Sequence, residues 1–84
     1  MQDGKNVLQK ALALVIKKHR KDRYISRLSN EIGLSKSIWS DLEHGRKDVQ
    51  ISTFCRIAEA LEVKSSVLLK EIEEILGENF TFIE

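Results

Sequence analysis

Proline is absent from the 84 residues of this sequence, and cysteine occurs once. Average usage of about 5% would give roughly four prolines, so the absence favours helices joined by turns of glycine and polar residues. The single cysteine, Cys55, excludes an internal disulfide and fits a reducing cytoplasm. Because Cys55 lies beside the apolar stripe of a predicted helix, we expect a small buried hydrophobic side chain there.

Long apolar runs are also missing. The longest fall far short of the roughly 20 residues that span a bilayer. Lysines at positions 10, 17 and 18 flank an apolar core of only residues 11–16, which is not the layout of a signal peptide. We therefore expect a cytoplasmic protein without contact to a membrane.

Catalytic and metal-binding patterns do not occur. The sequence has no Ser-His-Asp set, no nucleophile elbow and no glycine-rich phosphate loop. His19 and His44 have no Cys, His or Asp partner at metal-ligand spacing, which argues against a zinc site. The sequence thus indicates a protein that is not an enzyme and needs no cofactor.

What the sequence does contain is a helical pattern interrupted by glycine. Leu28 and Ile32 form an apolar pair that runs into Gly33, which can take a positive φ and end a helix. Leu34 follows as a turn residue, and Ser35 is a good N-cap for a second helix. That helix carries apolar residues at Ile38, Trp39 and Leu42, and Gly45 follows it. Two short helices joined in this way are typical of a helix-turn-helix, whose second helix can enter a DNA major groove.

Apolar spacings of three and four residues predict five helices in an all-α fold. Their approximate ranges are 6–20, 25–32, 36–43, 52–61 and 65–76. Ser65 or Ser66 can cap the last helix, and Gly77 ends it. We expect one domain over residues 1–84, with a core at about 6–77 and a C-terminal tail at 78–84. The tail alternates weakly in polarity, which leaves a short strand and an apolar plug as alternatives.

The net charge of +1 conceals an uneven distribution. Residues 5–47 carry eleven lysines and arginines against four acids, giving +7, whereas residues 48–84 carry three against eight, giving −5, and Asp3 adds −1. A basic face for a polyanion is one interpretation, and ordinary solvation of helices by charged side chains is the other. Lys36, Arg46 and Lys47 flank the second helix of the predicted helix-turn-helix, which favours the polyanion.

Residues 24–68 resemble the helix-turn-helix domain of the phage Cro/cI repressors and of the wider XRE-type regulators. The matching residues are Leu28, Ser37 and the ranges 32–35, 42–47 and 57–63. The layout, with one helix before and one behind, also resembles restriction–modification controller proteins. The resemblance implies a lambda-repressor-like fold and a homodimer that binds double-stranded DNA at a palindromic operator and represses transcription. Ile25 departs from the family, which has a phosphate-contacting glutamine at this position.

Four polar residues of the second helix are the candidate base readers. Lys36, Ser37, Ser40 and Asp41 fall on the face opposite Trp39 and Leu42, and their family counterparts touch base edges. Lysine can donate to guanine, serine can donate or accept, and aspartate can accept from cytosine. Contacts to the DNA backbone are expected from Ser35, Arg46 and Lys47. The alternative is a solvated helix face.

Two further residues of this helix are assigned structural roles. Trp39 lies where the family places a core residue, so we expect burial in preference to stacking on DNA. The resemblance also implies that Glu43 pairs with Arg20 and ties the second helix of the motif to the first helix of the chain.

The last helix has an apolar arc broader than a small domain buries, formed by Val67, Leu68, Leu69, Ile72, Ile75 and Leu76. The side near Leu68, Ile72 and Ile75 can pack on the other helices, and a dimer interface is predicted at Leu69, Ile72 and Leu76. The alternative is that the tail folds back and covers this surface. A rival function is an antitoxin-like module whose main partner is a protein and whose DNA binding is secondary.

Overall fold

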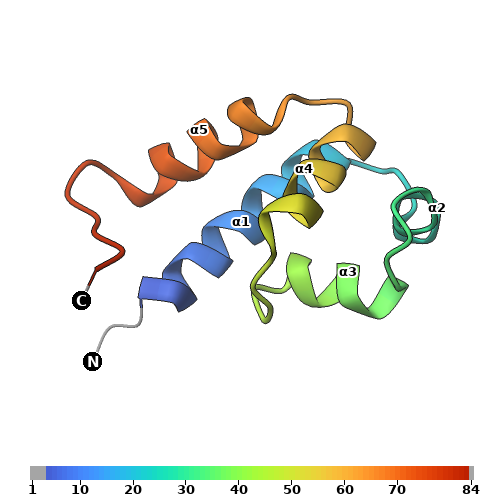
Figure 1. Cartoon of the computed structure of the whole chain (residues 1–84), viewed down its shortest axis with the longest axis horizontal. Helices are drawn as coiled ribbons and strands as arrows, with labels where there is room; N and C mark the ends of the chain where they lie inside the picture. Colours follow the sequence, from blue (N-terminus) through green and yellow to red (C-terminus); the bar gives the residue numbers. More distant parts are fainter. Residues whose placement is uncertain (1–3, 84) are drawn as a thin grey trace.

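The computed structural model describes residues 4–83, which form five α-helices (Figure 1). The helices are α1 (Gly4–Arg20), α2 (Ile25–Glu31), α3 (Lys36–Glu43), α4 (Ile51–Ala60) and α5 (Ser65–Leu76). No strand occurs within residues 4–83, and the predicted all-α, five-helix fold is confirmed. Residues 1–3 and 84, which include Asp3 and the end of the predicted tail, lie outside the described range.

Helix α1 organises the fold because it has neighbours on two sides. It packs against α5 on one side and α3 on the other, while α2 packs on α3 and α4 packs on α5. The buried residues follow the predicted stripes: Ala11, Leu12, Val15 and Ile16 in α1, Leu28 in α2, Trp39 and Leu42 in α3, Phe54, Ile57 and Ala58 in α4, and Leu68 and Ile72 in α5. Full burial of a large apolar side chain contributes about 1.5–3 kcal/mol, so these stripes are the main source of stability.

The ends of α3 and α5 show how the short helices are delimited. Ser35 caps α3 as predicted, because its Oγ accepts a hydrogen bond from the Ile38 amide at 3.2 Å. At the start of α5 the prediction is wrong. Lys64 occupies the N-cap position without a side-chain hydrogen bond, and Ser65 is already the first helical residue. A serine caps only from the position just before the helix, so neither Ser65 nor Ser66 can serve. Gly77 ends α5 with φ of 87°.

Cys55 is a second correction. Its side chain is exposed, not buried. It follows Phe54 by one position, and one residue turns the side-chain direction by about 100° around a helix. Phe54 and Ile57 point into the core, so Cys55 is turned toward solvent.

Helix α5 also differs from the prediction on its apolar arc. Ile72 is only 2% exposed and packs in the core, as expected for the inward side of the helix, and it also lines the same surface hollow as Leu69. Ile75, which was expected to pack inward, is 49% exposed. The inward face of α5 runs through Leu68 and Ile72, and the two flanks of the helix carry the exposed apolar side chains.

The described part of the tail, residues 78–83, forms no strand. Phe80 and Phe82 pack edge to face with ring centroids 4.9 Å apart. Both rings line a surface hollow with Leu76 at the end of α5, whereas Leu69 lies in a different hollow and stays 46% exposed. The tail therefore does not cover Leu69. None of the helices in the described residues is both long and apolar enough to cross a membrane.

Candidate nucleic-acid interface

Helices α2 and α3 are joined by a tight turn at residues 32–35. Gly33 has φ of 68°, a left-handed conformation that glycine adopts at little cost. The Leu34 amide donates to the Ser29 carbonyl at 2.9 Å and closes the turn. Arg56 of α4 makes a further hydrogen bond to this turn, because its Nη1 donates to the Ile32 carbonyl at 2.9 Å. The sequence did not predict this contact. The two helices and the turn thus have the predicted helix-turn-helix geometry, and α4 holds the turn.

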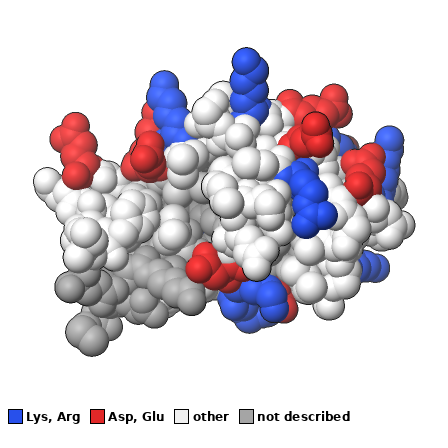
Figure 2. Space-filling view, viewed as in Figure 1, with Lys and Arg blue, Asp and Glu red and all other residues white. Residues whose placement is uncertain are grey.

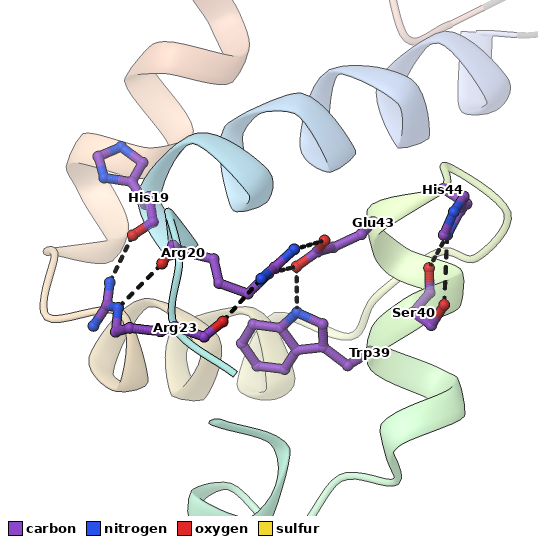
Figure 3. Close-up of polar contacts among 7 residues, drawn as sticks. All are labelled: His19, Arg20, Arg23, Trp39, Ser40, Glu43 and His44. Carbon is purple, nitrogen blue, oxygen red and sulfur yellow. Dashed lines mark hydrogen bonds and ion pairs between the residues drawn. The ribbon is translucent and has the colours of Figure 1, made fainter. Parts of the chain in front are cut away.

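A buried polar cluster fixes α3 to α1 (Figure 3). Arg20 donates from Nη2 to Glu43 Oε1 at 2.8 Å and from Nε to Glu43 Oε2. Trp39 is fully buried, and its Nε1 donates to the same Oε2 at 2.7 Å. Arg20 also donates to the Arg23 carbonyl at 2.8 Å. The predicted Arg20–Glu43 pair and the predicted burial of Trp39 are therefore confirmed, and the indole bond joins them into one cluster.

Glu43 stays ionised in this cluster. Burial alone opposes the charged form, since only 3% of the residue is exposed. Hydrogen bonds from Arg20 and Trp39, with the charges of Arg20 and Lys17, outweigh burial and hold the pKa of the Glu43 carboxyl below its usual range. The pair also raises the pKa of Arg20, mainly through the hydrogen bond to Glu43. The orientation of α3 on α1 therefore depends on a charged, fully bonded carboxylate.

All seven candidate contact residues lie on α3 or on the loops that flank it. Ser35, Lys36, Ser37, Arg46 and Lys47 are exposed, and Ser40 and Asp41 are partly exposed. The four candidate base readers share the outer side of α3, opposite the buried Trp39 and Leu42. Arg46 and Lys47 follow in the loop between α3 and α4. The predicted set is thus gathered on one accessible surface.

Several of these polar groups are already partly occupied. Ser35 Oγ accepts the capping bond and lies 3.3 Å from Ser37 Oγ. Asp41 Oδ1 accepts from Arg46 Nη2 at 3.1 Å and from Arg46 Nε at 3.2 Å. The candidate cytosine reader and a candidate phosphate contact are therefore paired with each other. The Arg46 side chain is largely exposed and that of Asp41 partly exposed, so separating them costs about 1 kcal/mol or less.

His44 at the end of α3 was assigned no contact from the sequence. Its Nδ1 lies 2.7 Å from the Ser40 carbonyl oxygen, which can only accept, so Nδ1 carries the proton in this bond (Figure 3). The exposed ring then leaves Nε2 for solvent or a ligand. Only the helical spacing of four residues between Ser40 and His44 could have indicated this contact.

The loop after α3 lies close to α1 at Gly45. This residue is buried, has φ of 68°, and a Cβ there would lie 3.3 Å from Lys10 Cγ and 3.4 Å from Lys10 Cα. The chain can approach α1 this closely because position 45 has no side chain. The approach sets the starting point of the segment that carries Arg46 and Lys47.

Figure 2 shows both signs of charge on this face of the molecule. Acidic and basic side chains stand together along the upper edge, over α5, and basic side chains with acidic ones beside them occur at the lower edge, near the loop that follows α3. Among the described residues no group of three or more His, Cys, Asp or Glu side chains is placed to hold a metal ion. The surface around α3 combines basic and hydroxyl side chains with one acidic side chain, Asp41.

The chain matches no protein-family model and no curated protein sequence. Its fold is similar to the crystal structure of the clp gene regulator ClgR from C. glutamicum, with a TM-score of 0.75 and 25% sequence identity. The match covers 83% of this chain and 94% of that chain. The similarity thus includes most of the five-helix fold, not the helix-turn-helix alone.

Proposed function

We propose that this protein is a DNA-binding transcription regulator that reads its site with α3. The observation that carries the proposal is the division of α3 into two faces. The inner face is locked to α1 by Trp39 and Glu43, and the outer face presents polar side chains. A rigid helix with an exposed polar face suits a major groove. The structural similarity to the gene regulator ClgR supports the same function.

Base contacts are proposed for Lys36, Ser37, Ser40 and Asp41. Backbone contacts are proposed for Ser35, Arg46 and Lys47, and the N-terminus of α3 adds a partial positive charge toward a phosphate. Arg46 occupies Asp41 Oδ1, so a base contact made by that oxygen would replace the bond to Arg46. A DNA phosphate can compensate Arg46 for that loss, so the two contacts would form together.

We also propose that the regulator is a homodimer on a palindromic operator and acts as a repressor by occluding polymerase. Of the predicted interface, Leu69 is exposed, Leu76 is partly buried, and Ile72 is largely buried but lines the same hollow as Leu69. Leu69 borders a hollow of about 190 Å³ whose lining includes Leu8, Val49, Ile51 and Phe54. Ile51 is 74% exposed, so this apolar hollow is open to a partner. A two-fold dimer would place two copies of α3 about 34 Å apart, one turn of DNA.

A salt series tests the proposal. Binding to a random-sequence duplex is measured by fluorescence anisotropy between about 50 and 200 mM salt, where each phosphate contact contributes a log–log slope of roughly −0.9. A steep slope is expected, followed by enrichment of a palindromic sequence from a random oligonucleotide pool. Absence of binding, or a slope near zero, would overturn the proposal and favour the protein-binding alternative.

A further inference from the structure

The outward face of α1 carries a strip of lysines with one leucine among them. Lys10, Leu14, Lys17 and Lys18 fall on this face at helical spacing, and all four are exposed. Leu14 is 57% exposed. Solvation by water accounts for a strip of exposed lysines. It does not account for an exposed leucine in the middle of the strip.

The adjoining flank of α5 has the opposite charge and the same apolar interruption. Glu71 and Glu74 lie on it at helical spacing, together with Val67 and Ile75. Ile75 is 49% exposed and Val67 is 41% exposed. This flank is distinct from the one that carries Leu69, which lines the hollow bordered by α4.

Contacts between α1 and α5 align the two strips. The helices run antiparallel (Figure 1). Lys18 Nζ lies 3.3 Å from Glu71 Oε1, and His19 Nε2 lies 2.9 Å from the same oxygen. About one turn away, Leu14 and Ile75 line a common hollow of about 280 Å³ with Lys18 and Glu74. We call this surface the α1–α5 seam, defined by Leu14, Lys18, Glu71, Glu74 and Ile75.

We propose that the α1–α5 seam is a second self-association surface, at which a second copy of this chain binds by its own seam. A two-fold axis parallel to the two helices lays α1 of one copy over α5 of the other. Leu14 then meets Ile75 of the second copy. Lys18 meets Glu71 and Glu74 of the second copy, and the same contacts recur on the other side of the axis. Leu14 and Ile75 bury apolar surface in the contact. The charged side chains on either side of them, which we call the charged rims, fix the orientation of the two copies.

Charge complementarity selects this occupant over others. A polyanion would be repelled by the glutamates of α5, and a polycation would be repelled by the lysines of α1. A surface that is half basic and half acidic, with an apolar line between the halves, complements itself after a two-fold rotation. The seam and the Leu69 hollow lie on different flanks of α5, so both contacts can form at once and link dimers into pairs.

The experiment isolates the seam in a Leu69→Lys background, where the other proposed contact is removed. Sedimentation velocity at micromolar to high micromolar protein concentration follows self-association at low and high salt without DNA, so the result does not depend on the proposed function. Leu69→Lys protein should still associate, and salt should weaken the association because the rims are exposed charges. Lys18→Glu alone and Glu74→Lys alone should each weaken it about tenfold, because reversal acts twice in a symmetric pair.

Mixing the two single charge variants is the decisive arm. In the mixed pair, the glutamate of the Lys18→Glu copy faces the lysine of the Glu74→Lys copy at one contact. At the other contact the native Lys18 faces the native Glu74. The association should therefore return toward that of the Leu69→Lys parent. Circular dichroism melts of each variant control for folding. A parent that stays monomeric at every salt concentration, or a mixture that associates no better than its components, overturns the proposal. Leu14→Lys should abolish the association. Cys55→Ser, at an exposed position of α4, should leave it unchanged.

Discussion

Trp39 donates its indole N–H to Glu43 at 2.7 Å inside the core, one turn apart on the same helix. The same carboxylate receives Arg20 from α1, so one acidic side chain serves both helices. Removing Glu43 would take away the partner of the Trp39 indole and the counter-charge of Arg20 at once. The orientation of α3 is thereby sensitive to substitutions on its inner face, opposite the proposed DNA contacts.

Glu43→Ala should lower the free energy of unfolding by about 3–5 kcal/mol, since it removes the counter-charge of the Arg20 guanidinium and leaves the buried indole N–H of Trp39 without an acceptor. Glu43→Gln keeps an acceptor for Trp39 but loses the charge. Its free energy of unfolding should therefore lie between those of the wild type and Glu43→Ala. Urea unfolding followed by tryptophan fluorescence measures both. Equal stability of the wild type and Glu43→Ala would contradict the role of the cluster.

Stability should fall in acid because of Glu43. Its pKa is lowered on folding, so the folded chain binds fewer protons and stability rises with pH. The contribution is fully present above the unfolded pKa of about 4.3 and is lost as pH falls through the lower folded value. Thermal melts from pH 6 to 2 should therefore show a steeper loss in the wild type than in Glu43→Gln. Parallel curves would exclude Glu43 as the cause.

Lys36→Ala and Ser40→Ala should relax sequence preference without unfolding the chain, because both side chains lie on the accessible side of α3. The expected cost on the selected site is about 1–3 kcal/mol for a good base contact, with little change on scrambled DNA. Competition binding against single-base variants gives the comparison. If both variants keep full discrimination, α3 does not read the site.

Arg46→Ala and Lys47→Ala should weaken binding to all duplexes and reduce the magnitude of the salt slope by roughly 0.9 each. Asp41→Asn should act in the opposite direction on random DNA, because it releases Arg46 and removes a negative charge. On the selected site the same change should reduce discrimination against a non-cytosine base. The gain on random DNA should vanish in an Arg46→Ala background, which a double-mutant cycle measures.

Leu69→Lys should give a folded protein with sharply reduced affinity for the operator, since it places a charge at the centre of the proposed dimer contact. Val67→Lys, on the other flank of the same helix, is the matched control for helix propensity. Operator binding by anisotropy, beside circular dichroism for folding, distinguishes the two. Unchanged affinity in Leu69→Lys would place the DNA-binding contact between copies elsewhere.

The helices were predictable because apolar periodicity records which side of each helix is buried. The spacing of Trp39 and Leu42 is therefore enough to define the inner face of α3, and its outer face follows. The Cys55 prediction failed because one position along a helix changes direction by about 100°. The prediction that Ile75 packs inward was wrong for a similar reason, since a broad apolar arc does not show where the part that faces the core ends.

Contacts that depend on side-chain rotamers or on elements distant in sequence were less accessible. The Arg20–Glu43 pair came from a family resemblance, but the bond from Trp39 to the same carboxylate requires the relative rotation of two side chains. Arg56 reaches the turn after α2 across 24 positions of sequence, and no local pattern indicates it. The pairing of Asp41 with Arg46 likewise depends on how the loop leaves α3.

The close approach of Gly45 to α1 helps to set the positions of Arg46 and Lys47, although Gly45 itself has no side chain. Alanine there would have to hold φ near 68° and would crowd Lys10, so the loop would move away from α1. Arg46 and Lys47 are the next two residues and would move with it. The absence of a side chain at position 45 therefore helps to set the distance between these two charges and the start of α3, and with it the phosphate spacing that the proposed DNA contacts would match.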